Sequence, residues 1–239
     1  MIICNGVPKN GTNILQKLCA LLNYKDSQLF LVQHKKNKSI NARYIENNNK
    51  KKISYNYANN VDNNYFCHAH IANPIKENLS QHKILTIWRD PRDSAVSFIR
   101  WAENRNKPNY KNNKEDLKRL IKEGYGGSNN WIDLYYNYIE WLNYKNCCNI
   151  SYESLKKGYY DNIKEYLEID FDDEYIYKNL FGNYNYLPNN KKAYSSISSY
   201  SGNESNYKNY WNNDLENTWK KLGGNELINY INSYFLDKI

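Results

Sequence analysis

The stretch MIICNGVPKNGTNILQKLCALL occupies residues 1–22 and combines three local signals. The apolar run Met1–Cys4 predicts a short strand, and apolar residues spaced by three and four from Ile14 onward predict a helix. Gly6 and Gly11 lie in the turn between them. A strand, a glycine-containing loop and a helix form the arrangement in which backbone N–H groups and the positive helix end hold an anion.

Three further strands are expected, at Tyr65–Ile71, Lys83–Trp88 and Cys147–Tyr152. The apolar run over Lys83–Trp88 is nearly continuous, which is typical of a strand buried on both faces of a parallel sheet. Helical patterns separate these strands along the chain. The alternation predicts an α/β, P-loop-like fold of three layers, with a mainly parallel central sheet flanked by helices.

Helices are predicted in the remaining apolar-periodic segments. Asp90 and Pro91 supply a cap and a first-turn proline for one of them. The others are expected at Ser128–Asn143, Ser154–Leu167 and Asp172–Phe181. Two further short helices are expected after Trp211, in the last part of the sequence. Residues 35–64 are rich in Asn and Lys with weak periodicity, and we expect an exposed, mobile excursion there.

Length and composition bound the remaining possibilities. A chain of 239 residues suits a single domain, residues 1–239. The net charge of +8 suits an anionic partner, but the lysines are scattered without a basic helix, so nucleic acid is disfavoured. Five cysteines without a CxxC pair favour a reduced, cytoplasmic setting. Neither a signal-peptide pattern nor a run of about 18 apolar residues occurs, so we expect no membrane span.

The loop Gly6–Asn13 is a candidate phosphate loop. A Walker A loop places Lys and then Ser or Thr after its second glycine, whereas this chain has Thr12 and Asn13 there. Its lysine, Lys9, lies inside the loop, within reach of the bridging oxygen of a nucleotide ester. This placement disfavours a nucleotide kinase. An ordinary turn with an exposed lysine is an equally good interpretation of the loop taken alone.

A second candidate anion site follows the buried strand at Lys83–Trp88. Arg89 is expected at the carboxyl edge of the sheet, where open α/β folds bind ligands. Its planar guanidinium matches a phosphate, and Ser97 adds a hydroxyl two turns into the next helix. The alternative is a structural pair between Arg89 and Asp90 or Asp93.

The two segments VPKNGTNI, residues 7–14, and RDPRDSAVS, residues 89–97, together resemble the cytosolic-type sulfotransferases. These enzymes carry motifs of the form YPKSGTTW and RxPxDxxxS and use 3′-phosphoadenosine-5′-phosphosulfate (PAPS). The separation of about 80 residues also agrees. The resemblance implies sulfuryl transfer from PAPS to an acceptor hydroxyl or amine, with release of 3′-phosphoadenosine-5′-phosphate (PAP) and without a metal.

The resemblance also implies a donor-binding set. Lys9 and the loop amides would hold the 5′-phosphosulfate, Arg89 and Ser97 the 3′-phosphate, and Tyr152 of the segment SYESL the adenine end. The late segment Tyr200–Trp211 keeps a glycine, Gly202, but lacks the family's Arg-Lys pair, for which Lys191, Lys192 or Lys208 are candidate substitutes. The full set is Pro8, Lys9, Asn10, Gly11, Thr12, Asn13, Arg89, Ser97, Tyr152 and Gly202.

A histidine between the two motifs is the expected base. His68 and His70 share one strand face because side chains alternate along a strand, and His70 fits the family pattern better. A neutral imidazole can accept the proton of an acceptor hydroxyl. Lys9, His70 and Ser97 are therefore the predicted catalytic residues. A metal site of Cys67, His68 and His70 is the alternative, although further ligands at suitable spacing are missing.

The acceptor is less defined. The aromatic side chains of Ser128–Asn143 are candidates to line a pocket for a small-molecule or carbohydrate acceptor. Two other functions stay open. One is a phosphate-loop kinase or hydrolase that uses ATP and Mg²⁺, with Asp90 as the candidate metal carboxylate. The other is a non-catalytic protein on the same fold that binds a nucleotide or a nucleic acid.

Overall fold

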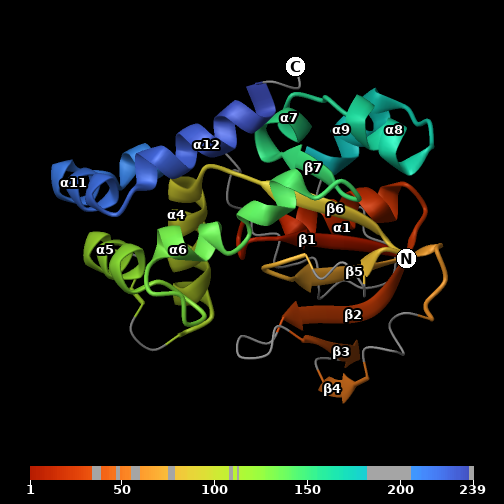
Figure 1. Cartoon of the computed structure of the whole chain (residues 1–239), viewed down its shortest axis with the longest axis horizontal. Coiled ribbons are helices and arrows are strands. Elements are labelled where there is room, and N and C mark those ends of the chain that lie inside the picture. Colours follow the sequence, from red (N-terminus) through yellow and green to blue (C-terminus); the bar gives the residue numbers. More distant parts are fainter. Residues whose placement is uncertain are drawn as a thin grey trace.

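The computed structural model describes residues 1–33, 39–46, 49–54, 60–74, 79–107, 110–111, 113–181 and 206–236. Strands of this part form one seven-stranded sheet with the order β4-β3-β2-β5-β1-β6-β7 (Figure 1). The strands are β1 (Ile2–Gly6), β2 (Lys25–Gln33), β3 (Ile40–Glu46), β4 (Asn49–Ile53), β5 (Tyr65–His70), β6 (Lys83–Trp88) and β7 (Cys148–Ser151).

The centre of the sheet is parallel, as predicted. β1 pairs in parallel with β5 on one side and with β6 on the other, and β6 continues in parallel to β7. β2 pairs in parallel with β5, whereas β3 and β4 join antiparallel at the far edge. Every residue of β1 is buried, because helices cover both faces, and this explains its continuous apolar run.

Helices flank the sheet in two layers. One apolar cluster joins the sheet to helices that include α4, α6 and α12, and a second joins the opposite face to α1, α8 and α9. The predicted three-layer α/β fold is therefore confirmed. The helices are α1 (Thr12–Leu21), α4 (Pro91–Asn104), α5 (Lys114–Glu123), α6 (Trp131–Tyr136), η1 (Ile139–Asn143), α7 (Tyr152–Lys156), α8 (Asp161–Leu167), α9 (Asp173–Phe181), η2 (Asn206–Asn209), α11 (Asn213–Lys221) and α12 (Gly224–Leu236). None of these described helices is long and apolar enough to cross a bilayer.

Two predicted helices are each divided in the structure. The segment expected from Ser128 begins only at Trp131, because Asn130 caps it by accepting a hydrogen bond from the backbone of Asp133, and it gives α6 and then η1. The helix expected over 154–167 is interrupted at Gly158, whose φ of 80° ends α7 before α8 begins. The prediction of single long helices was wrong at both places.

The Asn/Lys-rich segment contributes strands that the sequence analysis did not predict. In β3 the side chains of Ile40 and Ala42 are buried while Asn41 and Arg43 face outward. This period of two is that of a strand with one buried face. β4 forms the edge of the sheet, and its exposed Lys51 and Lys52 place charge there, which discourages further pairing. The mobility expected for this segment stays a prediction.

A buried amide fixes the point at which two central strands end. Asn5 is 0% exposed; its Nδ2 donates to the backbone oxygen of Ile71 at 3.1 Å, and its Oδ1 accepts from the Ile71 N–H at 2.9 Å. The pair joins β1 to the residue that follows β5. It therefore holds together the two chain segments that lead into the phosphate loop and out of the histidine strand.

We predict that Asn5→Ala lowers the free energy of unfolding by about 1–3 kcal/mol, because the buried Ile71 N–H loses its partner, while the Ile71 oxygen keeps the hydrogen bond from the Trp141 indole. Urea denaturation followed by circular dichroism measures the change. The exposed Asn137→Ala is the control and should stay within about 0.5 kcal/mol of the natural protein. A change of similar size in both variants would contradict this account of the strand ends.

Candidate active site

Three segments converge at the carboxyl edge of the central strands. The phosphate loop follows β1, His70 ends β5, and Arg89 follows β6. β1 lies between β5 and β6 and is parallel to both. Their carboxyl ends therefore meet at one edge of the sheet, which is where open α/β sheets bind ligands.

The phosphate loop reaches the helix through a glycine that no other residue can replace without strain. Gly11 is the N-cap of α1 and has a φ of 117°. A Cβ at this position would lie 3.1 Å from Ile87 Cδ1 and 3.1 Å from Tyr152 Cδ2. Because Gly11 offers no capping side chain and the first turn has no acidic residue, the first amides of α1 are suited to an anion.

Asn10 anchors the loop to three other elements. Its side chain is 0% exposed, and Nδ2 donates to the backbone oxygen of Ile87 at 3.3 Å. Its Oδ1 accepts hydrogen bonds from Ser94 Oγ at 2.7 Å and from the Tyr135 hydroxyl. The Asn10 backbone N–H donates to the Val7 oxygen. Asn10, predicted to bind the donor, thus serves to position the loop.

Lys9 lies in the loop with a left-handed backbone, at a φ of 74°. Its Nζ is 5.5 Å from the ring centroid of Trp101 on α4. Burial, and then the charges of Arg89 and Arg105, lower the pKa of Lys9 to about 8. The ammonium is therefore charged at neutral pH and loses its proton about two pH units earlier than a free lysine does.

The two histidines of β5 face the loop side by side, as predicted. Their ring centroids are 4.7 Å apart. His68 Nε2 lies 3.1 Å from Thr12 Oγ1, and His70 Nδ1 lies 2.7 Å from the backbone oxygen of Gly6. A carbonyl oxygen only accepts, so His70 carries its proton on Nδ1, which leaves a lone pair on Nε2. Burial lowers the pKa of His70 to about 4 and that of His68 well below its usual value.

The alternative metal site is not formed. Cys67 is completely buried in the apolar cluster on the opposite face of the strand from His68 and His70. Within the described ranges, no three His, Cys, Asp or Glu side chains lie close enough to share a metal ion.

Arg89 is a buried cation that is incompletely paired. It is 8% exposed, its guanidinium is 4.6 Å from the ring centroid of Tyr152, and its NH2 lies 3.9 Å from Asp93 Oδ2. In the part of the chain that the structure describes, Arg89 Nε has no hydrogen-bond partner. The predicted alternative pairing with Asp93 therefore exists only as a long ion pair. A buried guanidinium with an unused donor favours an anionic ligand.

Asp90, the carboxylate that a kinase would require for Mg²⁺, already caps a helix and forms an ion pair. Asp90 caps α4 by accepting from the Arg92 N–H, and its Oδ2 pairs with Arg92 at 2.7 Å. The cap and the first-turn Pro91 confirm the predicted helix start. Asp90 therefore serves the helix.

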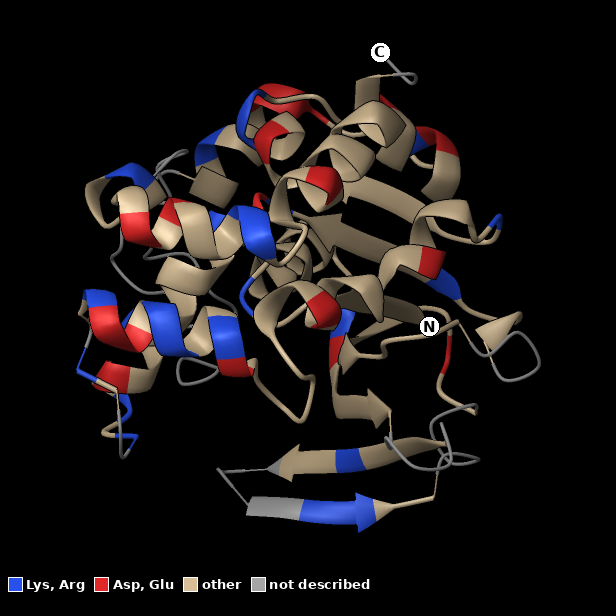
Figure 2. Ribbon diagram, turned by 60° about the vertical axis from the view of Figure 1, so that its left-hand side comes forward, with Lys and Arg blue, Asp and Glu red and all other residues tan. Residues whose placement is uncertain are grey.

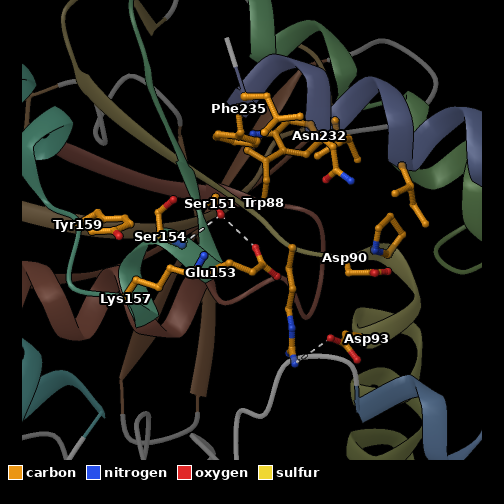
Figure 3. A pocket seen from close by; sticks show the side chains of 15 residues that line it. Trp88, Asp90, Asp93, Ser151, Glu153, Ser154, Lys157, Tyr159, Asn232 and Phe235 are labelled. Atoms are coloured by element: carbon orange, nitrogen blue, oxygen red, sulfur yellow. Dashed lines mark hydrogen bonds and ion pairs between the residues drawn. The ribbon is translucent and has the colours of Figure 1, made fainter. Parts of the chain in front are cut away.

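A pocket of about 390 Å³ opens beside Arg89 between α7 and α12 (Figure 3). Trp88 and Phe235 supply apolar walls, and Asn232 adds a polar group from α12. Glu153 accepts a hydrogen bond from Ser151 Oγ at 3.0 Å, and burial raises the pKa of this carboxyl group. The pocket thus extends from Arg89 to the residues that follow β7.

The other predicted residues lie around this core. Pro8 and Asn13 are half-buried in the loop, and Ser97 is half-buried on α4, one turn before Trp101. Tyr152 is 4% exposed, and its ring packs against the guanidinium of Arg89. Lys208 is exposed on η2. Three predicted residues, Gly202, Lys191 and Lys192, lie outside the described part of the chain.

Two contacts at the site were missed by the sequence analysis, namely those of Trp101 and Tyr207. Trp101 is four residues after Ser97, a spacing that places both on one helix face and could have identified it. The Tyr207 N–H donates to Asp93 Oδ1 at 2.8 Å, and its ring lies 4.0 Å from the guanidinium of Arg92. No local pattern connects residues so distant along the chain.

Comparison with known proteins identifies the family and agrees with the fold. A profile of the sulfotransferase domain family matches residues 1–239. A mouse sulfotransferase crystallised with PAP has a TM-score of 0.66 and 20% identity, over 95% of this chain and 84% of that chain. A retinol dehydratase in complex with androsterone and inactive cofactor PAP has a TM-score of 0.55 and 14% identity, over 98% of this chain and 80% of that chain. Among curated proteins no significant match was found.

We predict that His70 is neutral at pH 7 with its proton on Nδ1, because the Gly6 oxygen accepts that hydrogen. Long-range ¹H–¹⁵N NMR distinguishes the two ring nitrogens, and a pH titration should place the midpoint near 4. His70→Gln assigns the signal. A proton on Nε2, or a midpoint above 6, would contradict the proposed lone pair.

Proposed function

The chain belongs to the sulfotransferase domain family, and we propose that its donor is PAPS and its acceptor a hydroxyl or amine of a small molecule or carbohydrate. The observation that carries this proposal is the pair of cations, Lys9 and Arg89, at one edge of the sheet. PAPS carries anionic groups at its 5′ and 3′ positions. Two cations near different ends of one nucleotide suit such a donor.

Each end of the donor has a candidate holder. Lys9 and the first amides of α1 are proposed to hold the 5′-phosphosulfate, since a lysine and a helix N-terminus both favour negative charge. The unused Nε of Arg89 supports binding of the 3′-phosphate through charge-assisted hydrogen bonds. Ser97 and Tyr152 are proposed to complete the nucleotide site.

The chemistry follows from the protonation states. The acceptor oxygen attacks sulfur while Nε2 of His70 takes its proton, and the bond between sulfur and the bridging oxygen breaks. The electron pair of that bond moves onto the leaving phosphate of PAP. The Lys9 ammonium stabilises the growing charge. Lys9, Arg89 and the loop amides supply the positive charge for the transfer, so we expect EDTA to leave it unchanged.

The alternative functions are less well supported. A Mg²⁺-dependent kinase would need Asp90, which caps α4 and pairs with Arg92. A nucleic-acid-binding protein would need a continuous basic face, whereas Lys and Arg are interspersed with Asp and Glu over the helices in Figure 2. The identity of the acceptor and the cytoplasmic location stay predictions.

Titration calorimetry with PAP tests the donor site. We expect Lys9→Ala and Arg89→Ala each to weaken PAP binding by about 10- to 100-fold, the usual effect of losing a charged hydrogen-bond partner. The exposed Lys221→Ala and Arg43→Ala are matched controls and should bind as the natural protein does. ATP with Mg²⁺ should bind much more weakly than PAP.

Two results would contradict the assignment. If both site variants kept the affinity of the natural protein, PAP would have to bind elsewhere. If ATP with Mg²⁺ bound more tightly than PAP, the kinase interpretation would replace the donor assignment.

A further inference from the structure

The ammonium of Lys9 lies in a neighbourhood that opposes its charge. Burial lowers the pKa of Lys9 most, and the charges of Arg89, which follows β6, and Arg105, which follows α4, lower it further. The two charged or titratable groups that face it from β5 are His68 and His70, both neutral above pH 6. A residue that must be charged for the reaction therefore needs a stabilising contact.

The ring of Trp101 supplies such a contact. Its centroid lies 5.5 Å from Lys9 Nζ, inside the range of about 6 Å at which an indole face attracts a cation. Phe98, on the same helix, packs against Trp101 with ring centroids 5.5 Å apart. This packing against Phe98 restricts the orientation of the indole, so its contact with Lys9 is maintained by a neighbour on the same helix.

We propose that Trp101 is a positioning residue that holds Lys9 in its charged form against α4, ready for the leaving phosphate oxygen. This inference rests on the proposed function and adds a residue to its mechanism. Trp101 contacts neither donor nor acceptor in this account. It affects the reaction only indirectly, by keeping the Lys9 side chain protonated and in position.

The sign of the effect follows from the cation–π contact. The indole stabilises the ammonium and not the neutral amine, so removing the ring makes deprotonation easier. The pKa of Lys9, about 8 in the natural protein, should fall by about 0.5 to 1.5 pH units in Trp101→Leu. PAP binding above pH 8 should then weaken more than in the natural protein.

Three variants separate this effect from general damage. Trp101→Leu removes the ring, and Trp101→Phe restores a smaller one and should give an intermediate pKa. Tyr125→Leu is the matched control, because Tyr125 packs on Phe98 with ring centroids 4.5 Å apart and so belongs to the same aromatic cluster. It is 40% exposed and should leave the pKa of Lys9 unchanged.

The first measurement uses the full-length protein without any nucleotide. NMR of ¹³C-labelled lysine side chains follows the Lys9 Cε signal against pH, with Lys9→Arg for assignment. We expect a lower midpoint in Trp101→Leu and an intermediate one in Trp101→Phe. An unchanged or higher midpoint in both variants would overturn the proposal.

The second measurement is the PAP dissociation constant at two pH values. Relative to the natural protein, Trp101→Leu should bind PAP about 3- to 20-fold more weakly at pH 8.5 and within about 2-fold at pH 6.5. Equal weakening at both pH values would indicate a packing role and overturn the charge-holding role. Failure of the natural protein to bind PAP would instead overturn the proposed function, while the lysine titration would still report on Trp101.

Discussion

The buried amide of Asn10 is the contact on which the site depends. Its three side-chain hydrogen bonds join the phosphate loop to β6, to Ser94 on α4 and to Tyr135 on α6. The loop is therefore fixed from the core side by Asn10. Lys9 and the first amides of α1 lie next to this anchor, at the carboxyl edge of the sheet.

The site combines uncompensated positive charge with neutral imidazoles. Lys9 has a depressed pKa, and Arg89 keeps a buried nitrogen without a partner in the described structure. Such groups lower stability until an anion binds, so the arrangement favours a multiply charged ligand. Burial, and to a smaller extent the charge of Lys9, lower the pKa of His70 and keep it neutral, which a base requires before it accepts a proton.

The parts of this site that could be predicted from the sequence are those specified by local pattern. Apolar runs identified β1 and β6, two more strands were predicted at β5 and β7, and the period of two placed His68 and His70 on one face. The internal strand β2 was not predicted. The role of Asn10 could not be predicted, because its partners Ser94 and Tyr135 lie 84 and 125 residues away in the sequence. The break at Gly158 was missed because glycine inside an apolar-periodic segment was accepted as helical.

The central claim is that two cations hold two different ends of one donor. Phosphorus-31 NMR of PAP bound at saturation tests it directly, because the 3′- and 5′-phosphates give separate signals. The account predicts that Lys9→Arg shifts mainly the 5′-phosphate signal and that Arg89→Lys shifts mainly the 3′-phosphate signal. If both substitutions moved the same signal, or neither moved any, the two-ended site would be contradicted.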